Sequence, residues 1–148
     1  MIILDTNVVS ALMRREPDAA VLRWLDGQPA ESLWLTSVTV LEVLLGIALL
    51  PIGRRQQALL AAFEGLVAED LGGRVLDFDR SAAAQAASLA AERQRAGRPI
   101  DLRDTQIAGI ALARRSAVAT RNTRHFGDLS VPVVDPWTAT TTPPRWRG

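Results

Sequence analysis

The chain has 148 residues, the size of one compact domain, and a formal net charge of +1 at pH 7. It contains no cysteine, a single histidine (His125) and no lysine, so that all 17 basic residues are arginines. These absences exclude disulfide scaffolds, thiolate and multi-histidine metal sites, P-loop nucleotide binding and Schiff-base chemistry. Carboxylates, hydroxyl groups and arginines remain available for chemistry.

Apolar runs and apolar residues at helical spacing alternate along the first half of the chain. They predict, in chain order, a strand at 2–4, helices at 8–14 and 18–28, a strand at 33–36, and helices at 38–50 and 53–69. Asp18 and Ser37 are placed to cap two of these helices. Pro51 and the Gly72-Gly73 pair end the last two.

The same alternation continues in the second half of the chain. It predicts strands at 74–78, 118–120 and 131–134, an alanine-rich helix from Asp79 or Ser81 to about residue 96, and a helix at 101–115. Strands that alternate with helices indicate an α/β domain with a parallel sheet and right-handed crossovers. Residues 1–137 form this predicted domain, and the threonine- and proline-rich residues 138–148 are expected to be a disordered tail.

Two features bear on the cellular compartment. The N-terminus lacks the basic region of a signal peptide, and the longest apolar stretch, 38–52, is interrupted by Glu42 and is too short to span a bilayer. We therefore expect a soluble cytoplasmic protein with no membrane partner.

Acidic and amide side chains fall where a parallel sheet binds its ligands, beyond the carboxyl ends of the strands. Asp5 follows the first predicted strand, and Asn122 follows the fourth. Two further acids come from helices: Glu42 lies in an apolar helix, and Asp104 lies in the first turn of another. Each acid also has an ordinary structural alternative. Asp5 can be a turn or helix-cap residue, Glu42 can lie on the exposed side of its helix, and Asp104 can interact with a helix dipole.

Taken together, these acids point to a cation. The sequence places no lysine and no adjacent histidine to neutralise them, and carboxylates that converge without basic partners repel one another. A hard divalent cation with oxygen ligands relieves this repulsion, and we expect Mg²⁺, with Mn²⁺ as a plausible substitute. Such an ion activates water for phosphodiester hydrolysis without a protein nucleophile.

Several short motifs occur around these residues: Leu4-Asp5-Thr6-Asn7, Glu42 followed by Gly46, Asp104 followed by Ile107-Ala108, Thr120-Arg121-Asn122 followed by His125-Phe126, and Asp135-Pro136-Trp137. In this order and spacing they resemble the PIN-domain ribonucleases. More narrowly, they resemble the VapC-type toxins of bacterial toxin–antitoxin pairs, including the FitB-like branch. The resemblance covers about residues 1 to 137 and implies a PIN-like three-layer α/β/α sandwich whose central parallel sheet has four to five strands.

The resemblance also implies roles for individual residues. Asp5, Glu42 and Asp104 would hold the metal and act as catalytic residues, and Asn122 would be the fourth catalytic position. Because a neutral amide binds a hard cation less well than a carboxylate, Asn122 puts a second metal position in doubt.

Other residues near these positions have two readings. Thr6 and Thr120 are similar to hydroxyl residues that orient the acids in the family, and strand-end hydrogen bonding is the alternative. Asp101 is expected to cap the helix that carries Asp104 rather than to enlarge the acidic site. Arg121 and Arg124 flank the site and are possible phosphate-binding residues. His125 is expected to belong to a short turn beside Phe126 rather than to act as a general base.

The implied function is that of a metal-dependent endoribonuclease, the toxin of a type II toxin–antitoxin system, with RNA as substrate and a VapB-like antitoxin as inhibitor. A homodimer is expected, with possible hetero-oligomers that reach operator DNA through the antitoxin. Apolar residues in 38–50 and in the next helix exceed what one face buries, which favours a partner surface. The alternative is a non-catalytic PIN-like module that binds RNA or a protein.

Overall fold

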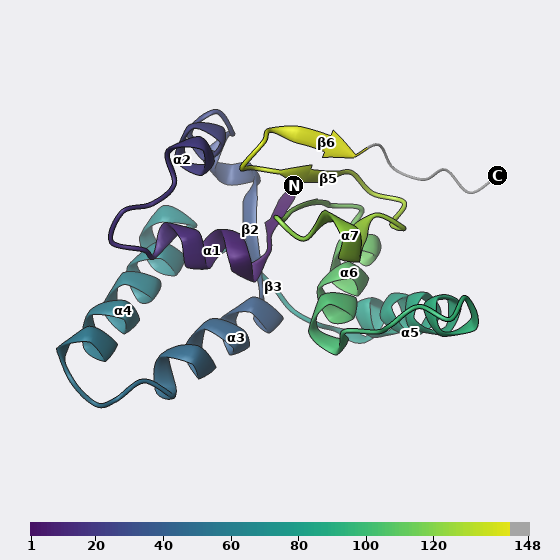
Figure 1. Cartoon of the computed structure of the whole chain (residues 1–148), viewed down its shortest axis with the longest axis horizontal. Helices are drawn as coiled ribbons and strands as arrows, with labels where there is room; N and C mark the ends of the chain where they lie inside the picture. The colour runs from purple at the N-terminus through teal and green to yellow at the C-terminus, as the bar shows by residue number, and fades with distance from the viewer. Residues whose placement is uncertain (143–148) are drawn as a thin grey trace.

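The computed structural model describes residues 1–142, which are built on a six-stranded sheet with the order β3-β2-β1-β4-β5-β6 (Figure 1). The strands are β1 (Ile2–Leu4), β2 (Leu33–Thr36), β3 (Val75–Leu76), β4 (Ala117–Ala119), β5 (Val133–Asp135) and β6 (Thr140–Thr142). The first five pair in parallel with their neighbours, so the predicted parallel sheet is confirmed with five strands.

The sixth strand corrects the prediction for the end of the chain. Residues 138–148 were expected to be a disordered tail, but Thr140–Thr142 forms β6, which pairs antiparallel with β5. Threonine favours extended backbone, and the otherwise open edge of β5 supplies the hydrogen-bonding partner. Residues 143–148 of the predicted tail lie outside the described residues.

Helices connect the strands and cover both faces of the sheet. They are α1 (Thr6–Leu12), α2 (Ala19–Asp26), α3 (Ser37–Ala48), α4 (Arg54–Gly65), α5 (Arg80–Arg95), α6 (Leu102–Arg114) and α7 (Thr123–Phe126). A short 3₁₀ helix (Ala30–Ser32) precedes β2, and a π-helical turn (Leu66–Asp70) extends α4, so the predicted helix at 53–69 has two parts. None of the helices within residues 1–142 is long and apolar enough to cross a membrane.

Side-chain caps account for several helix starts. Asp18, Asp79 and Asp101 cap α2, α5 and α6, as their positions in the sequence predict. The prediction that Ser37 caps α3 is wrong, because the hydroxyl oxygen of Thr36 accepts the hydrogen bond from the backbone N–H of Thr39 at 3.1 Å. Thr36 has the extended backbone that a cap needs, whereas Ser37 is already helical.

Successive side chains of a strand point to opposite faces of the sheet, so the apolar core has two parts, one on each face. A sheet between two helical layers is the predicted three-layer arrangement. In β1 and β4, Ile3 and Val118 pack with α5, α6 and α7, whereas Leu4 and Ala119 pack with α1, α2, α3 and α4. Figure 1 shows α5 and α6 to one side of the sheet and α1 to α4 to the other. The parallel strands thus end at one edge, between the two helical layers.

Helices α5 and α6 approach each other closely at Gly109. A Cβ atom at this position would lie 2.5 Å from the carbonyl oxygen of Ala82 and 2.7 Å from the Cβ atom of Ala86. Both neighbours are buried in the interior, so neither can move aside cheaply.

We expect Gly109→Ala to lower the free energy of unfolding by about 2 kcal/mol or more, because the added methyl overpacks the α5–α6 contact. Gly46→Ala is the matched control: it lies within α3 with no atom within 4 Å of the new Cβ, so it should stabilise the fold by about 0.5–1 kcal/mol. Urea unfolding of both variants measures the difference. Equal stability of Gly109→Ala and the native chain would contradict the close contact.

Candidate active site

The predicted site residues meet at a cavity on the edge where the parallel strands end. Its volume is about 350 Å³, and it is lined by Asp5, Thr6, Asn7, Ser10, Arg14, Glu42, Asp104, Arg121, Asn122 and Trp137. All four predicted catalytic residues therefore face the same space. Thr120 lies behind the lining and contacts Asp5, whereas Arg124 lies exposed on α7 and is not among the lining residues.

Asp5 is the most buried acid of the site, with 3% of its surface exposed. One carboxylate oxygen accepts from the backbone N–H of Thr6 at 2.8 Å, and the other accepts from the Thr120 hydroxyl at 2.7 Å and from the Asn7 amide at 3.3 Å. Burial raises the pKa of Asp5 to about 6, against the opposing effect of the Thr120 and Thr6 hydrogen bonds. The negative charges of Asp104 and Glu42 raise this pKa further, so the three carboxylates lie within electrostatic reach of one another.

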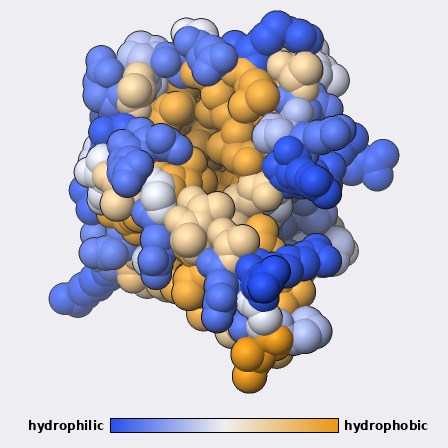
Figure 2. All heavy atoms as spheres, turned by 90° about the vertical axis from the view of Figure 1, so that its left-hand side faces the viewer, coloured by the Kyte–Doolittle hydropathy of each residue, from blue (hydrophilic) through white to orange (hydrophobic). Residues whose placement is uncertain are grey.

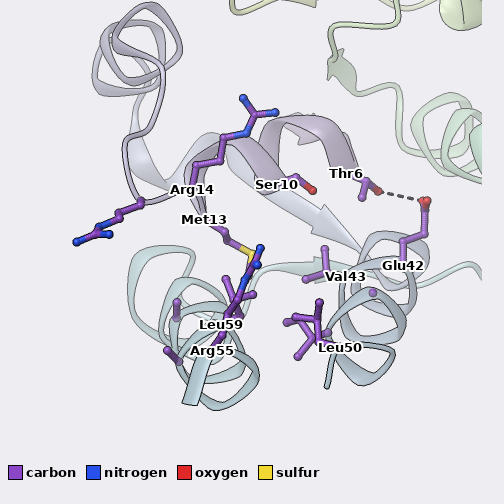
Figure 3. A pocket seen from close by; sticks show the side chains of 14 residues that line it. Thr6, Ser10, Met13, Arg14, Glu42, Val43, Leu50, Arg55 and Leu59 are labelled. Atoms are coloured by element: carbon purple, nitrogen blue, oxygen red, sulfur yellow. Dashed lines mark hydrogen bonds between the residues drawn. The ribbon is translucent and has the colours of Figure 1, made fainter. Parts of the chain in front are cut away.

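Glu42 is held by side chains from two other helices. Its Oε1 accepts a hydrogen bond from the Thr6 hydroxyl at 2.9 Å (Figure 3), and its Oε2 lies 3.6 Å from an Arg103 guanidinium nitrogen. The expectation that the acids lack basic neighbours is therefore wrong for Glu42. Arg103 precedes Asp104 on α6, and the packing of α3 against α6 brings it to Glu42.

Asp104 also has a basic partner, since its Oδ2 is hydrogen-bonded to Nδ1 of His125. His125 lies on α7 beside the buried Phe126, as expected, but it contacts the site as well. Asp101 accepts from the backbone N–H of Asp104 at 2.9 Å and caps α6, in agreement with the predicted capping role.

The two predicted supporting threonines each contact an acid. Thr6 donates to Glu42, and Thr120 donates to Asp5. Because the Thr120 proton points to Asp5, its oxygen is free to accept from the backbone N–H of Asn122 at 3.0 Å. One buried hydroxyl thus ties the carboxylate after β1 to the amide residue after β4.

A buried arginine anchors α7 and Asp128, the segment that directly follows the cavity residue Asn122. Arg93 of α5 binds both carboxylate oxygens of Asp128 at 2.8 Å, and it donates to the carbonyl of His125 at 2.6 Å and to the hydroxyl of Thr105 at 3.3 Å. Burial alone would raise the pKa of Asp128, but the hydrogen bonds and charge of Arg93, with the charge of Arg98, hold it below its ordinary value. The segment between Asn122 and Asp128 is therefore fixed from the interior.

The chemistry of the donor set fits a hard divalent cation, because three carboxylates and one carboxamide offer oxygen ligands. Within residues 1–142, however, no three acidic or imidazole groups are arranged as a closed metal-binding set. Arg103 and His125 contact oxygens of Glu42 and Asp104 that a cation would need. An ion that bound through either of these two oxygens would have to displace the basic side chain beside it.

A larger apolar groove adjoins the acidic cavity and shares Thr6, Ser10, Arg14 and Glu42 with it. The groove has a volume of about 950 Å³ and runs between α1, α3 and α4; its apolar lining includes Met13, Val43, Gly46, Ile47, Leu50 and Leu59, and Arg14, Arg15 and Arg55 also line it (Figure 3). In Figure 2 the face formed by these helices is hollowed and apolar at its centre, with hydrophilic side chains around it. We call this feature the apolar groove.

A family model described as the PIN domain matches residues 2–131. The chain belongs to the PIN-domain family. It is 42% identical over 137 residues to the VapC ribonuclease Y4jK of Sinorhizobium fredii, a match that covers 93% of this chain and 98% of that protein. It is 37% identical to Toxin FitB of Neisseria gonorrhoeae, with 93% and 99% covered.

The fold agrees with a solved structure of the same group. The crystal structure of FitAcB from Neisseria gonorrhoeae matches with a TM-score of 0.85 and 37% identity, covering 93% of this chain and 99% of that chain. The predicted resemblance to VapC-type toxins and to the FitB-like branch is confirmed by these similarities.

Sequence reasoning missed several residues of this PIN-domain cavity. Ser10 and Arg14 follow the predicted supporting residue Thr6 at intervals of four, the spacing that places residues along one side of a helical segment, and this signal was available. Arg103 and Trp137 carry no comparable signal, because only the packing of separate elements brings them to the acids.

The raised pKa of Asp5 makes stability depend on pH. Folding shifts the Asp5 pKa from 3.8 to about 6, so the protonated group favours the folded state and this contribution is lost as the pH rises through 6. Without metal, Asp5→Asn should therefore be about 1–3 kcal/mol more stable than the native chain at pH 7.5, a gain that disappears below pH 4. Thermal unfolding in EDTA at both pH values measures it, and an identical difference at both would contradict the shift.

Proposed function

We propose that this PIN-domain protein is an endoribonuclease that hydrolyses RNA phosphodiesters with metal-activated water and acts as the toxin of a type II toxin–antitoxin system. The observation that carries the proposal is that Asp5, Glu42, Asp104 and Asn122 line one cavity. The similarity to proteins named VapC ribonuclease and Toxin FitB supports it independently.

In this proposal Asp5, Glu42 and Asp104 hold Mg²⁺, or Mn²⁺ in its place, and Asn122 completes the site. When bound, the ion supplies an activated water and neutralises charge that develops on the phosphate. The protein's own groups orient the ligands: the Thr120 hydroxyl fixes the Asp5 carboxylate, and the Thr6 hydroxyl fixes Glu42. The exposed Arg121 at the cavity binds a phosphate of the RNA, and Arg124 on α7 is available for a neighbouring phosphate.

We expect purified protein to cleave RNA in Mg²⁺ and to lose this activity in EDTA. Asp5→Asn and Glu42→Gln should abolish cleavage, because each keeps the size of the side chain but removes an anionic ligand. His125→Ala should cost no more than about tenfold, since His125 contacts a ligand rather than serving as one. A gel assay on labelled RNA, with circular dichroism to check folding, measures these effects.

Asp101→Asn is the matched control, because it alters a carboxylate one turn from Asp104 and asparagine also caps helices well. Its cleavage rate should equal that of the native chain. Activity that survives EDTA and disappears with His125→Ala would replace metal catalysis by histidine acid–base catalysis. RNA binding without any cleavage would favour the alternative, a non-catalytic PIN-like module.

We also propose that the apolar groove receives a segment of a cognate VapB-like antitoxin. The groove has a largely apolar lining with arginines beside it, and it shares four residues with the acidic cavity, so a bound segment would cover the site. The match to the FitAcB structure supports a partner of this kind. Exposed Leu41, Leu49 and Ile52 on and after α3 supply a further apolar surface for the expected homodimer, and operator DNA would be reached through the antitoxin.

Gly46 allows a direct test of the groove. A side chain placed there meets no atom within 4 Å, so Gly46→Leu should fill the groove without unfolding the protein. We expect it to weaken binding of a cognate VapB-like antitoxin by about tenfold or more, equivalent to about 1.4 kcal/mol. Calorimetric titration measures the affinity, and Gly46→Ala is the control of minimal size. Unchanged affinity for Gly46→Leu would place the antitoxin elsewhere.

A further inference from the structure

Arg121 and Trp137 form a stacked pair at the edge of the acidic cavity. The guanidinium carbon of Arg121 lies over the Trp137 ring, 5.0 Å from its centroid, and both residues line the cavity with Asp5 and Asn122. Arg121 follows β4 and Trp137 follows β5, so two neighbouring strands of the sheet supply the pair.

Both members of the pair are anchored. The Trp137 ring packs against the apolar layer that contains Leu4 and Ala119, and its backbone N–H donates to Oδ1 of Asp135 at 2.9 Å. The backbone N–H of Arg121 donates to Oδ1 of Asn7 at 3.2 Å. The platform is therefore positioned before any ligand arrives.

The charge of Arg121 remains available for a ligand. Three carboxylates line the same cavity, yet within residues 1–142 no carboxylate forms an ion pair with the Arg121 guanidinium. Arg103 and His125, by contrast, both contact acids of the site. Arg121 is exposed, and its contact is with an aromatic face.

A guanidinium over an indole ring offers two functions to a nucleic acid. Its open face stacks on a nucleobase, and its N–H groups donate to phosphate oxygens. A base inside a duplex has both faces covered by its neighbours, so only an unpaired base can stack on such a platform. A rim that carried only cationic side chains would bind the phosphates of single-stranded and double-stranded RNA alike.

We infer that Arg121 and Trp137 form a stacking subsite for an unpaired nucleobase beside the scissile phosphate. This inference rests on the proposed function and adds the two residues that hold a base beside the point of cleavage. The ligand is an unpaired nucleotide. Its base stacks on the face of the Arg121 guanidinium, and an adjoining phosphate accepts hydrogen bonds from the N–H groups at the edge of the guanidinium.

The test measures binding separately from cleavage. In the Asp5→Asn background, fluorescence anisotropy at fixed salt compares a labelled RNA oligonucleotide, single-stranded or annealed to its complement. Arg121→Lys keeps the charge but loses the planar group, and Trp137→Leu removes the ring beneath it. Each should weaken single-strand binding by about fivefold or more, the size of one lost base stack, and weaken duplex binding by a clearly smaller factor.

Three controls accompany the test. Trp137→Phe keeps an aromatic face and should lose less affinity than Trp137→Leu. Arg80→Lys alters an exposed arginine in the first turn of α5 and should change neither affinity. Thermal unfolding identifies any variant of the partly buried Trp137 that fails to fold. If one fails, the result for Arg121→Lys, a change at an exposed residue, is the test of the subsite.

The outcomes separate this inference from the proposed function. Selective loss of single-strand binding supports the subsite even if Mg²⁺ produces no cleavage by the native chain. Native affinity for single strands in Arg121→Lys and Trp137→Leu overturns it even if the chain cleaves RNA. An equal loss for single strands and duplex shows a plain phosphate contact and also overturns it, as does the absence of measurable single-strand binding by the parent variant.

Discussion

The hydrogen bond from Thr120 to Asp5 is the interaction on which the site depends. It joins the residues that follow β1 and β4, two neighbouring parallel strands, and it is buried. Through it, a carboxylate is held in an interior that disfavours its charge, while Glu42 and Asp104 add repulsion. The sheet topology supplies this arrangement, since parallel strands deliver their following residues to the same edge.

Much of the fold follows from local pattern. The strand predicted at 33–36 coincides with β2, and Asp79 and Asp101 begin the helices they were expected to cap, because apolar runs and cap residues act over a few residues. Thr140–Thr142 did not follow from pattern. This strand forms because the edge of β5 is free to pair with it, and only the tertiary structure brings that edge beside residues 140–142.

The acidic residues of the candidate site could be predicted from the sequence, but the basic residues that contact them could not. Asp5, Glu42 and Asp104 could be identified because each stands at a strand end, in an apolar helix or in a first helical turn. Arg103 and His125 could not, since the same residues would be ordinary surface groups if α3, α6 and α7 crossed differently. The expectation of a site without basic partners failed for this reason.

The buried pair of Arg93 and Asp128 has a consequence for local motion. A loop held only at its surface opens independently of the core, at low free energy. Here the carbonyl of His125 is bonded to an arginine that also binds α6 through Thr105, so the loop and the two helices share one set of contacts. Amide hydrogens of this loop should then exchange with solvent on the timescale of the interior helices, so the chain that follows the cavity residue Asn122 is held rigid and adaptation to a ligand is left to the side chains that line the cavity.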